Sequence, residues 1–155
     1  MGLQQLILQA TKAQLQCCTD AGLLADPHRD RIPENAGGDV AHAAPDHGDI
    51  NLLVFGGSQG ARFFSEILPD ALALVGEKLR RQLVVTLQSR PEDKIKAEQA
   101  LEKLNIASNV QSFFTDLPQK IAGSQLVMCR SGASSVAELA LIGRPSILVP
   151  LPGAL

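Results

Sequence analysis

From residue 51 onward, short apolar runs alternate with longer stretches of helical periodicity, and this alternation limits the possible folds more than any other feature of the sequence. Continuous apolar runs bounded by glycines or polar residues are typical of strands that are buried on both faces. They predict strands at 52–55, 83–87, 110–114, 125–129 and 146–149, with helices at 61–75, 89–104, 117–122 and 134–143. The alternation predicts an α/β fold, a Rossmann-like parallel sheet with flanking helices and right-handed crossovers.

Local signals refine the predicted helices. Pro69 falls inside the first helix and is expected to kink or divide it, because proline cannot donate the backbone hydrogen bond of a helix interior. The second helix is expected to begin near Ser89, since Ser89 and Glu92 have the spacing of a capping box and Pro91 lies between them. Gly143 is a natural C-terminal cap for the last helix.

The first 49 residues differ from the rest of the chain. Residues 1–18 could form a short helix with one loosely apolar face. Residues 24–49 show no helical or strand period and are rich in Asp, His, Arg, Pro, Gly and Ala, so they are predicted to be a linker or disordered. This bias fits either a divergent linker or translation in a shifted reading frame. Two parts are therefore expected, at 1–49 and 50–155.

Charge and composition exclude several classes of function. A formal net charge of -2 argues against a nucleic-acid-binding surface, which would be strongly basic. The three cysteines, two of them adjacent, do not make a disulfide framework, and no spacing typical of a metal site occurs. No apolar run approaches the roughly 18 residues of a membrane span, and no signal peptide begins the chain. We therefore expect a cytoplasmic protein without metal or cofactor.

The first unusual loop, GGSQGAR at 56–62, follows the first predicted strand. Glycines let backbone N–H groups approach a diphosphate closely, the following helix adds a partial positive charge, and Ser58 can donate its hydroxyl to a phosphate oxygen. The alternative is a tight strand-to-helix turn in which Ser58 caps the helix. The loop is neither a Walker A motif nor a Gly-x-Gly-x-x-Gly motif, which argues against an ATPase or a dehydrogenase.

The second unusual loop, RSGASSVAE at 130–138, follows the fourth predicted strand. It offers three serine hydroxyls, a glycine for close approach, and the start of a helix that would favour an anion. Glu138 lies one turn into that helix and could accept two hydrogen bonds from the vicinal hydroxyls of a ribose. The alternative is an acidic residue that only favours the positive end of the helix.

Together, GGSQGAR after LLVF and CRSGASSVAELALIGRPSILVPLP resemble the C-terminal domain of the bacterial peptidoglycan GlcNAc transferases of glycosyltransferase family 28, over roughly residues 50–155. The resemblance implies one half of a GT-B fold that binds the donor, UDP-GlcNAc. It also implies transfer of GlcNAc to undecaprenyl-diphosphate-muramoyl pentapeptide, which converts lipid I to lipid II at the inner face of the cell membrane. Nucleic acid is not an expected partner.

Carried over position by position, the resemblance assigns Ser58 to the donor diphosphate, the backbone at Phe114 to the uracil, and Glu138 to the ribose. No catalytic base or metal ligand can be assigned. The full set of expected donor contacts is Gly57, Ser58, Gln59, Arg62, Phe114, Arg130, Ser131, Gly132, Ala133, Ser134, Ser135, Val136 and Glu138.

Other parts of the family pattern have no counterpart in this sequence. Residues 1–50 do not match an acceptor-binding domain, and the sequence stops before the segment that contacts the sugar. We therefore expect a chain truncated at both ends that supplies donor binding and is inactive alone. One alternative is a non-catalytic donor-binding subunit of a split glycosyltransferase. Another is a sugar-nucleotide epimerase of similar fold, for which no catalytic acids or histidine can be placed.

Overall fold

The structure, a computed structural model, describes residues 50–150 of the 155-residue chain. The helix expected at 1–18 and the linker expected at 24–49 lie outside the described residues. The division of the chain at residue 50 therefore stays a prediction.

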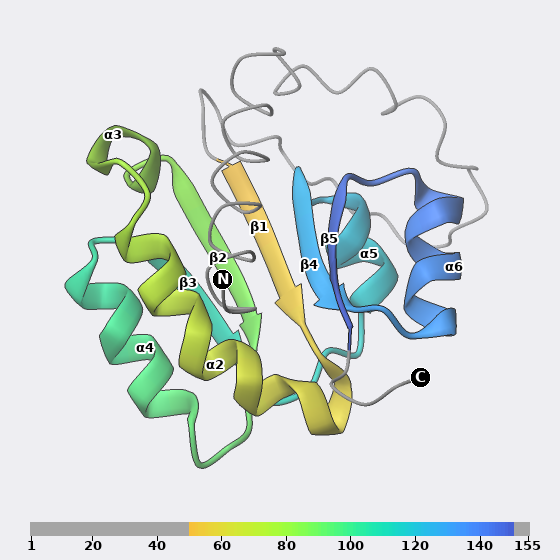
Figure 1. Cartoon of the computed structure of the whole chain (residues 1–155), viewed down its shortest axis with the longest axis horizontal. Helices are drawn as coiled ribbons and strands as arrows, with labels where there is room; N and C mark the ends of the chain where they lie inside the picture. Colours follow the sequence, from red (N-terminus) through yellow and green to blue (C-terminus); the bar gives the residue numbers. More distant parts are fainter. Residues whose placement is uncertain (1–49, 151–155) are drawn as a thin grey trace.

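Residues 50–150 form a five-stranded sheet with the order β3-β2-β1-β4-β5 (Figure 1). All four neighbouring pairs of strands are parallel, which confirms the predicted fold class. The strands are β1 (Ile50–Phe55), β2 (Leu83–Gln88), β3 (Ala107–Gln111), β4 (Leu126–Arg130) and β5 (Ser146–Val149).

The helices form one layer on each face of the sheet. Helices α2 and α4 lie on one face, and α5 and α6 lie on the other (Figure 1). None of the helices in the described part of the chain is long and apolar enough to cross a membrane. The helices are α2 (Gly57–Ala73), α3 (Glu77–Arg80), α4 (Lys94–Lys103), α5 (Leu117–Ala122) and α6 (Ala133–Ile142).

The alternating sides of β1 contribute to two separate apolar clusters. Leu52 and Val54 are fully buried in the cluster under α2 and α4, while Leu53 and Phe55 belong to the cluster under α5 and α6. Burying a large aliphatic or aromatic side chain contributes about 1.5–3 kcal/mol, so a central strand that is covered on both faces is firmly held. The site therefore stands on a rigid strand.

Two expectations about the helices are wrong. Helix α2 is not divided at Pro69, and it begins at Gly57, four residues before the expected start. Helix α4 begins at Lys94 with Asp93 as its N-cap, and the capping box at Ser89 does not form. Ser89 is fully buried, where its Oγ accepts a hydrogen bond from Ser65 Oγ at 2.9 Å. Its hydroxyl is therefore engaged against α2 and does not cap α4.

The third strand was predicted three residues too late. Strand β3 occupies Ala107–Gln111, and its first three residues are exposed because β3 is an edge strand. Such a strand needs no apolar run, so the apolar pattern pointed to the residues that follow it. Phe114 consequently lies in the loop between β3 and α5.

Candidate functional site

The order of the strands reverses between β1 and β4. From β1 the chain runs outward to β2 and β3, then returns to β4 on the other side of β1 and continues to β5. Phe55 pairs with Cys129 at the carboxyl ends of these neighbouring strands, so the loops that follow them leave the sheet side by side. One loop leads into α2 on one face and the other into α6 on the opposite face (Figure 1). Ligands of open α/β sheets bind at such a reversal point.

The first loop turns sharply into α2. Gly56 is the N-cap, and Gly57 follows with a φ of 64°, in the left-handed region that favours glycine. Ser58 and Gln59 belong to the first turn of α2, but their side chains lie outside what the structure describes. Ser58 does not form the predicted alternative, a cap for the helix, because the N-cap position belongs to Gly56.

One residue of this site was missed by the sequence reasoning. The Oε1 atom of Gln88, the last residue of β2, accepts hydrogen bonds from the backbone N–H groups of Gly56 at 3.2 Å and Gly57 at 3.1 Å. The only signal in the sequence was a polar residue at the end of an apolar run. Nothing in the sequence indicated its partners, which lie 31 and 32 residues away along the chain.

The second loop leads into α6 with its small residues exposed. Gly132 is the N-cap in an extended conformation, with φ -74° and ψ 146°, and no side chain caps the helix. Ser131, Ala133 and Ser134 are exposed and Ser135 is half-buried. The N–H of Ser131 donates to Val149 O at 3.3 Å, which ties this loop to the end of β5.

The two helices that begin at this edge share one electrostatic property. Both α2 and α6 have a glycine at the N-cap and no acidic residue in the first turn. Helices α4 and α5 begin instead at Asp93 and Asp116, whose negative charges favour their own positive helix ends. The ends of α2 and α6 therefore keep partial positive charge and N–H donors for an anion.

Glu138 lies in the second turn of α6 and is half-buried. Its carboxylate forms no hydrogen bond or ion pair with another residue between 50 and 150. Burial and the negative charge of Glu138 raise the pKa of the Cys129 thiol to about 11. This coupling puts the Glu138 carboxylate within electrostatic range of the end of β4. Its oxygens can accept hydrogen bonds from a ligand.

Phe114 is fixed by its side chain. It is 7% exposed and packs in the cluster of Ile121 and Cys129, with Lys120 Nζ 5.4 Å from the centre of its ring. The backbone of Phe114 forms no hydrogen bond with another residue of the 50–150 region. A buried side chain, with a backbone that bonds to no other residue of this region, suits the expected role, because the backbone is what would contact a base.

Both predicted arginine contacts are engaged by the protein itself. Arg62 Nε donates to Glu66 Oε1 at 2.9 Å, and this hydrogen bond raises the pKa of the guanidinium further. Arg130 Nη1 donates to Pro150 O at 2.8 Å, and its Cζ lies 4.2 Å from the centre of the Phe63 ring. Contacts of these arginines with a ligand stay predictions.

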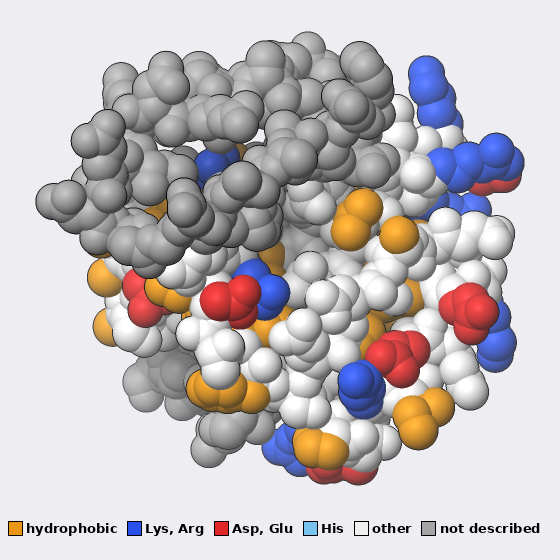
Figure 2. Space-filling view, turned by 180° about the vertical axis from the view of Figure 1, so that it is seen from behind, with side chains coloured by type: hydrophobic (Ala, Val, Ile, Leu, Met, Phe, Trp, Pro, Cys, Tyr) orange, Lys and Arg blue, Asp and Glu red, His pale blue; other side chains and the backbone are white. Residues whose placement is uncertain are grey.

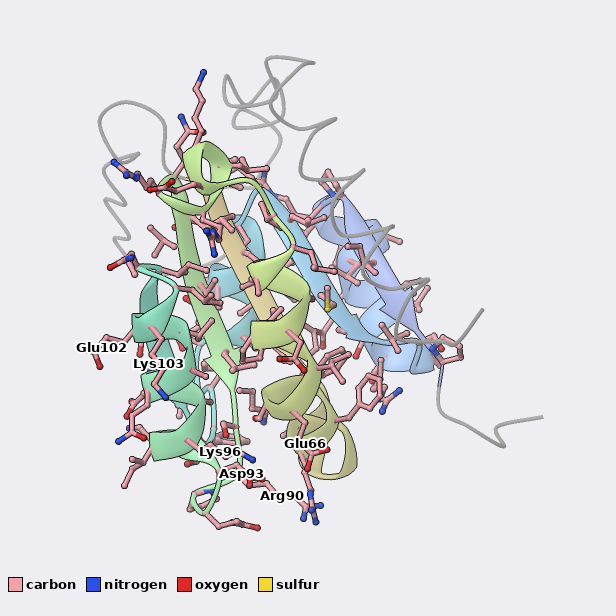
Figure 3. All side chains as sticks on the ribbon, turned by 60° about the vertical axis from the view of Figure 1, so that its left-hand side comes forward. Glu66, Arg90, Asp93, Lys96, Glu102 and Lys103 are labelled. Atoms are coloured by element: carbon pink, nitrogen blue, oxygen red, sulfur yellow. The ribbon has the colours of Figure 1, made fainter. Side chains whose placement is uncertain are left out.

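Other features of the described residues suit the expected ligand less well. A cavity of about 540 Å³ lies between the end of α4 and the start of β3 and is lined by Glu98 and Glu102, whose charges would repel a diphosphate. Figure 3 shows Glu66, Arg90 and Asp93 gathered near the start of α4, where charges of both signs are mixed. No group of three or more metal-binding side chains occurs among residues 50–150.

Comparisons with known proteins show the family to which the chain belongs. Residues 51–155 match the model of the glycosyltransferase family 28 C-terminal domain. Two curated relatives carry the name UDP-N-acetylglucosamine–N-acetylmuramyl-(pentapeptide) pyrophosphoryl-undecaprenol N-acetylglucosamine transferase. The one from Sinorhizobium fredii is 49% identical over 130 residues, covering 84% of this chain and 34% of the relative. The one from Rhodopseudomonas palustris is 55% identical over 108 residues, covering 70% of this chain and 30% of the relative.

A solved structure is similar as well. The crystal structure of Acinetobacter baumannii MurG superposes with a TM-score of 0.62 and 28% identity, over 72% of this chain and 33% of that one. The chain thus spans about a third of the length of the relatives that it matches.

Proposed function

We propose a function from the family of the chain, since residues 51–155 belong to the C-terminal domains of glycosyltransferase family 28. The chain binds the UDP part of UDP-N-acetylglucosamine as the donor half of a GlcNAc transferase. The acceptor is undecaprenyl-diphosphate-linked muramoyl pentapeptide, the lipid intermediate in the names of the relatives. The observation that carries the proposal is the meeting of two glycine-capped helix starts, α2 and α6, at the point where the strand order reverses.

The chemistry of a UDP leaving group fits this arrangement. As the bond from the sugar to the diphosphate breaks, negative charge grows on the diphosphate oxygens. Helix N-termini and hydroxyl groups that already point at this position stabilise that charge without reorganising. The N–H groups of α2 and α6, with Ser134 and Ser135, serve this role, and Ser58 is a further donor by its place in the first loop.

The nucleoside is recognised at two further points. Glu138 accepts hydrogen bonds from the ribose hydroxyls, which are charge-assisted and therefore strong. The backbone at Phe114, held by its buried side chain, contacts the uracil and selects it over other bases. Base recognition accounts for a preference for UDP over ADP, while the contact with the ribose adds affinity that the two ligands share.

Transfer also requires an acceptor hydroxyl at reacting distance, and such positioning supplies about 7–11 kcal/mol of barrier lowering. Direct displacement with inversion at the anomeric carbon needs a base that deprotonates this hydroxyl. No residue between 50 and 150 is assigned to either task, so we expect these residues to bind the donor without turnover. Because the acceptor is lipid-linked, the complete reaction belongs at the cytoplasmic membrane surface.

Nuclear magnetic resonance on the ¹⁵N-labelled 155-residue chain tests the location of the site. Titration with UDP should shift the amide signals of 56–60, 112–115 and 131–138, since these groups surround the proposed ligand. The amides of Glu98, Glu102 and Asn105 at the distant cavity should stay unchanged and serve as an internal control. Shifts confined to the cavity would contradict the proposal.

A further inference from the structure

Two glutamine side chains hold β1, one at each end. At the amino end, Gln125 Oε1 accepts a hydrogen bond from Asn51 N at 2.8 Å. At the carboxyl end, Gln88 Oε1 accepts two, from Gly56 N at 3.2 Å and Gly57 N at 3.1 Å. The amide oxygen of glutamine has two lone pairs and both partners are donors, so only Oε1 can face them. Each glutamine thus accepts backbone hydrogen bonds at one end of β1, and the two ends lie at opposite edges of the sheet.

The contact at the carboxyl end falls on the glycine loop of the proposed site. Gly57 has a φ of 64°, and no atom lies within 4 Å of the place where a Cβ would be built on it. Its conformation is therefore not imposed by packing around the Cβ position. The two hydrogen bonds that Gln88 accepts, called the Gln88 bridge below, hold the turn from β1 into α2.

The same bridge decides which N–H groups remain for a ligand. The first N–H groups of a helix have no acceptor within the helix, which makes them anion-binding groups. Those of Gly56 and Gly57 are already taken by Gln88. Of the four N–H groups without a helical acceptor at the start of α2, this leaves those of residues 58 and 59 for the diphosphate.

We propose that Gln88 is a positioning residue of the donor site, which sets the glycine loop so that the N–H groups of residues 58 and 59 meet the donor diphosphate. The inference rests on the proposed function. Gln88 acts through the loop, so its influence falls on the phosphates of the ligand and leaves base and ribose recognition unchanged.

Calorimetry with UDP and with uridine separates this role from a general loss of stability. Gln88→Met keeps the length of the side chain and removes the acceptor. We expect the affinity for UDP to fall about tenfold, the equivalent of one or two lost hydrogen bonds, while the affinity for uridine stays unchanged. Gly56 and Gly57 should also exchange their amide hydrogens faster than in the original chain.

Gln125→Met is the matched control, because it removes the same kind of bond from the far end of β1. It should lower stability and leave the ratio of UDP to uridine affinity unchanged. Gln88→Glu is a second test that retains an acceptor oxygen for both N–H groups, so it should stay folded even if Gln88→Met does not. Its added negative charge beside the loop should weaken UDP binding at neutral pH without affecting uridine.

The outcomes distinguish this inference from the proposed function. If the original chain prefers UDP to ADP but Gln88→Met or Gln88→Glu keeps its ratio of UDP to uridine affinity, the positioning role is overturned and donor binding stands. If the original chain does not prefer UDP to ADP, the proposed function fails, and the positioning role fails with it.

Discussion

The guanidinium carbon of Arg130 lies 4.2 Å from the centre of the Phe63 ring. The same group is 5.4 Å from the ring of Phe64, and its Nη1 donates to Pro150 O. Arg130 ends β4, Phe63 and Phe64 belong to α2, and Pro150 follows β5. One side chain therefore links three elements around the site. Removal from water lowers the pKa of this guanidinium but leaves it charged at neutral pH.

Replacing Arg130 should therefore lower the free energy of unfolding. A partly desolvated cation–π contact contributes about 0.5–2 kcal/mol. A hydrogen bond from a charged group contributes about 1.5–3 kcal/mol net, and less where the bond is exposed, as the bond to Pro150 is. We expect Arg130→Ala to cost about 1–3 kcal/mol in urea unfolding. Arg130→Lys should recover only part of this loss, because an ammonium cannot stack as a planar guanidinium does.

The matched control for this prediction is Arg81→Ala. Arg81 is exposed, and among residues 50–150 its one ion pair is with Glu77, an i,i+4 pair of the kind that contributes little. It should leave the unfolding midpoint unchanged. Equal midpoints for Arg130→Ala and Arg81→Ala would show that Arg130 does not brace the site.

Glu138→Ala should weaken UDP binding by about 1.5–3 kcal/mol, the range for hydrogen bonds to a charged group. The reason is the loss of the carboxylate that accepts from the ribose hydroxyls. Calorimetry with UDP and with 2′,3′-dideoxy-UDP isolates this contact, since the second ligand lacks both hydroxyls. The substitution should leave dideoxy-UDP binding unaffected. An equal loss with both ligands would mean that Glu138 does not bind the ribose.

Two glycines with positive φ allow a paired test of the first loop. Alanine at either position is strained by about 1–2 kcal/mol, because a Cβ disfavours the left-handed region. Gly57→Ala and Gly143→Ala should thus destabilise the chain to a similar extent, since neither Cβ would meet another atom within 4 Å. Only Gly57→Ala should also weaken UDP binding, since Gly143 caps the far end of α6. Similar UDP affinity in the two variants would argue against the first loop as the diphosphate site.

The buried thiol of Cys129 gives a prediction on pH. Its pKa is raised to about 11 in the folded chain from an ordinary value near 9.0, because burial and Glu138 disfavour the thiolate. A raised pKa contributes stability that is present below pH 9 and is lost as the pH rises towards 11. Urea unfolding of the original chain should therefore weaken more between pH 9 and 11 than that of Cys129→Ala. Parallel pH profiles would contradict the assignment.

The sequence predicted those elements whose boundaries depend on local chemistry. The strand at 146–149 and the helix at 117–122 were placed at the observed residues, since an apolar run and a Leu-Pro helix start define them locally. The start of α4 was misplaced because the hydroxyl of Ser89 contacts Ser65, 24 residues away. Strand β3 was misplaced because an edge strand with exposed residues lacks an apolar pattern.

The features of the candidate site also divide into those set by local sequence, which could be predicted, and those set by long-range contacts, which could not. Both loops are local motifs, and the parallel topology that the sequence predicted brings them to one edge of the sheet. The bridge from Gln88 to the glycine loop and the stacking of Arg130 on Phe63 join residues that are far apart along the chain. No sequence spacing encodes such contacts. The distribution of side chains over the surface is likewise not encoded in any sequence spacing. On the face seen in Figure 2, apolar side chains lie exposed in separate patches.

The proposed function requires that residues 50–150 bind a uridine diphosphate donor at the junction of β1 and β4. Isothermal titration calorimetry of the 155-residue chain with UDP, and in parallel with ADP at the same pH and ionic strength, tests it most directly. The two ligands carry the same diphosphate and ribose and differ only in the base. We expect tighter binding of UDP than of ADP, and an excess of UDP-N-acetylglucosamine should prevent UDP from binding because it occupies the same site. Equal affinity for UDP and ADP, or no binding of either, would contradict it.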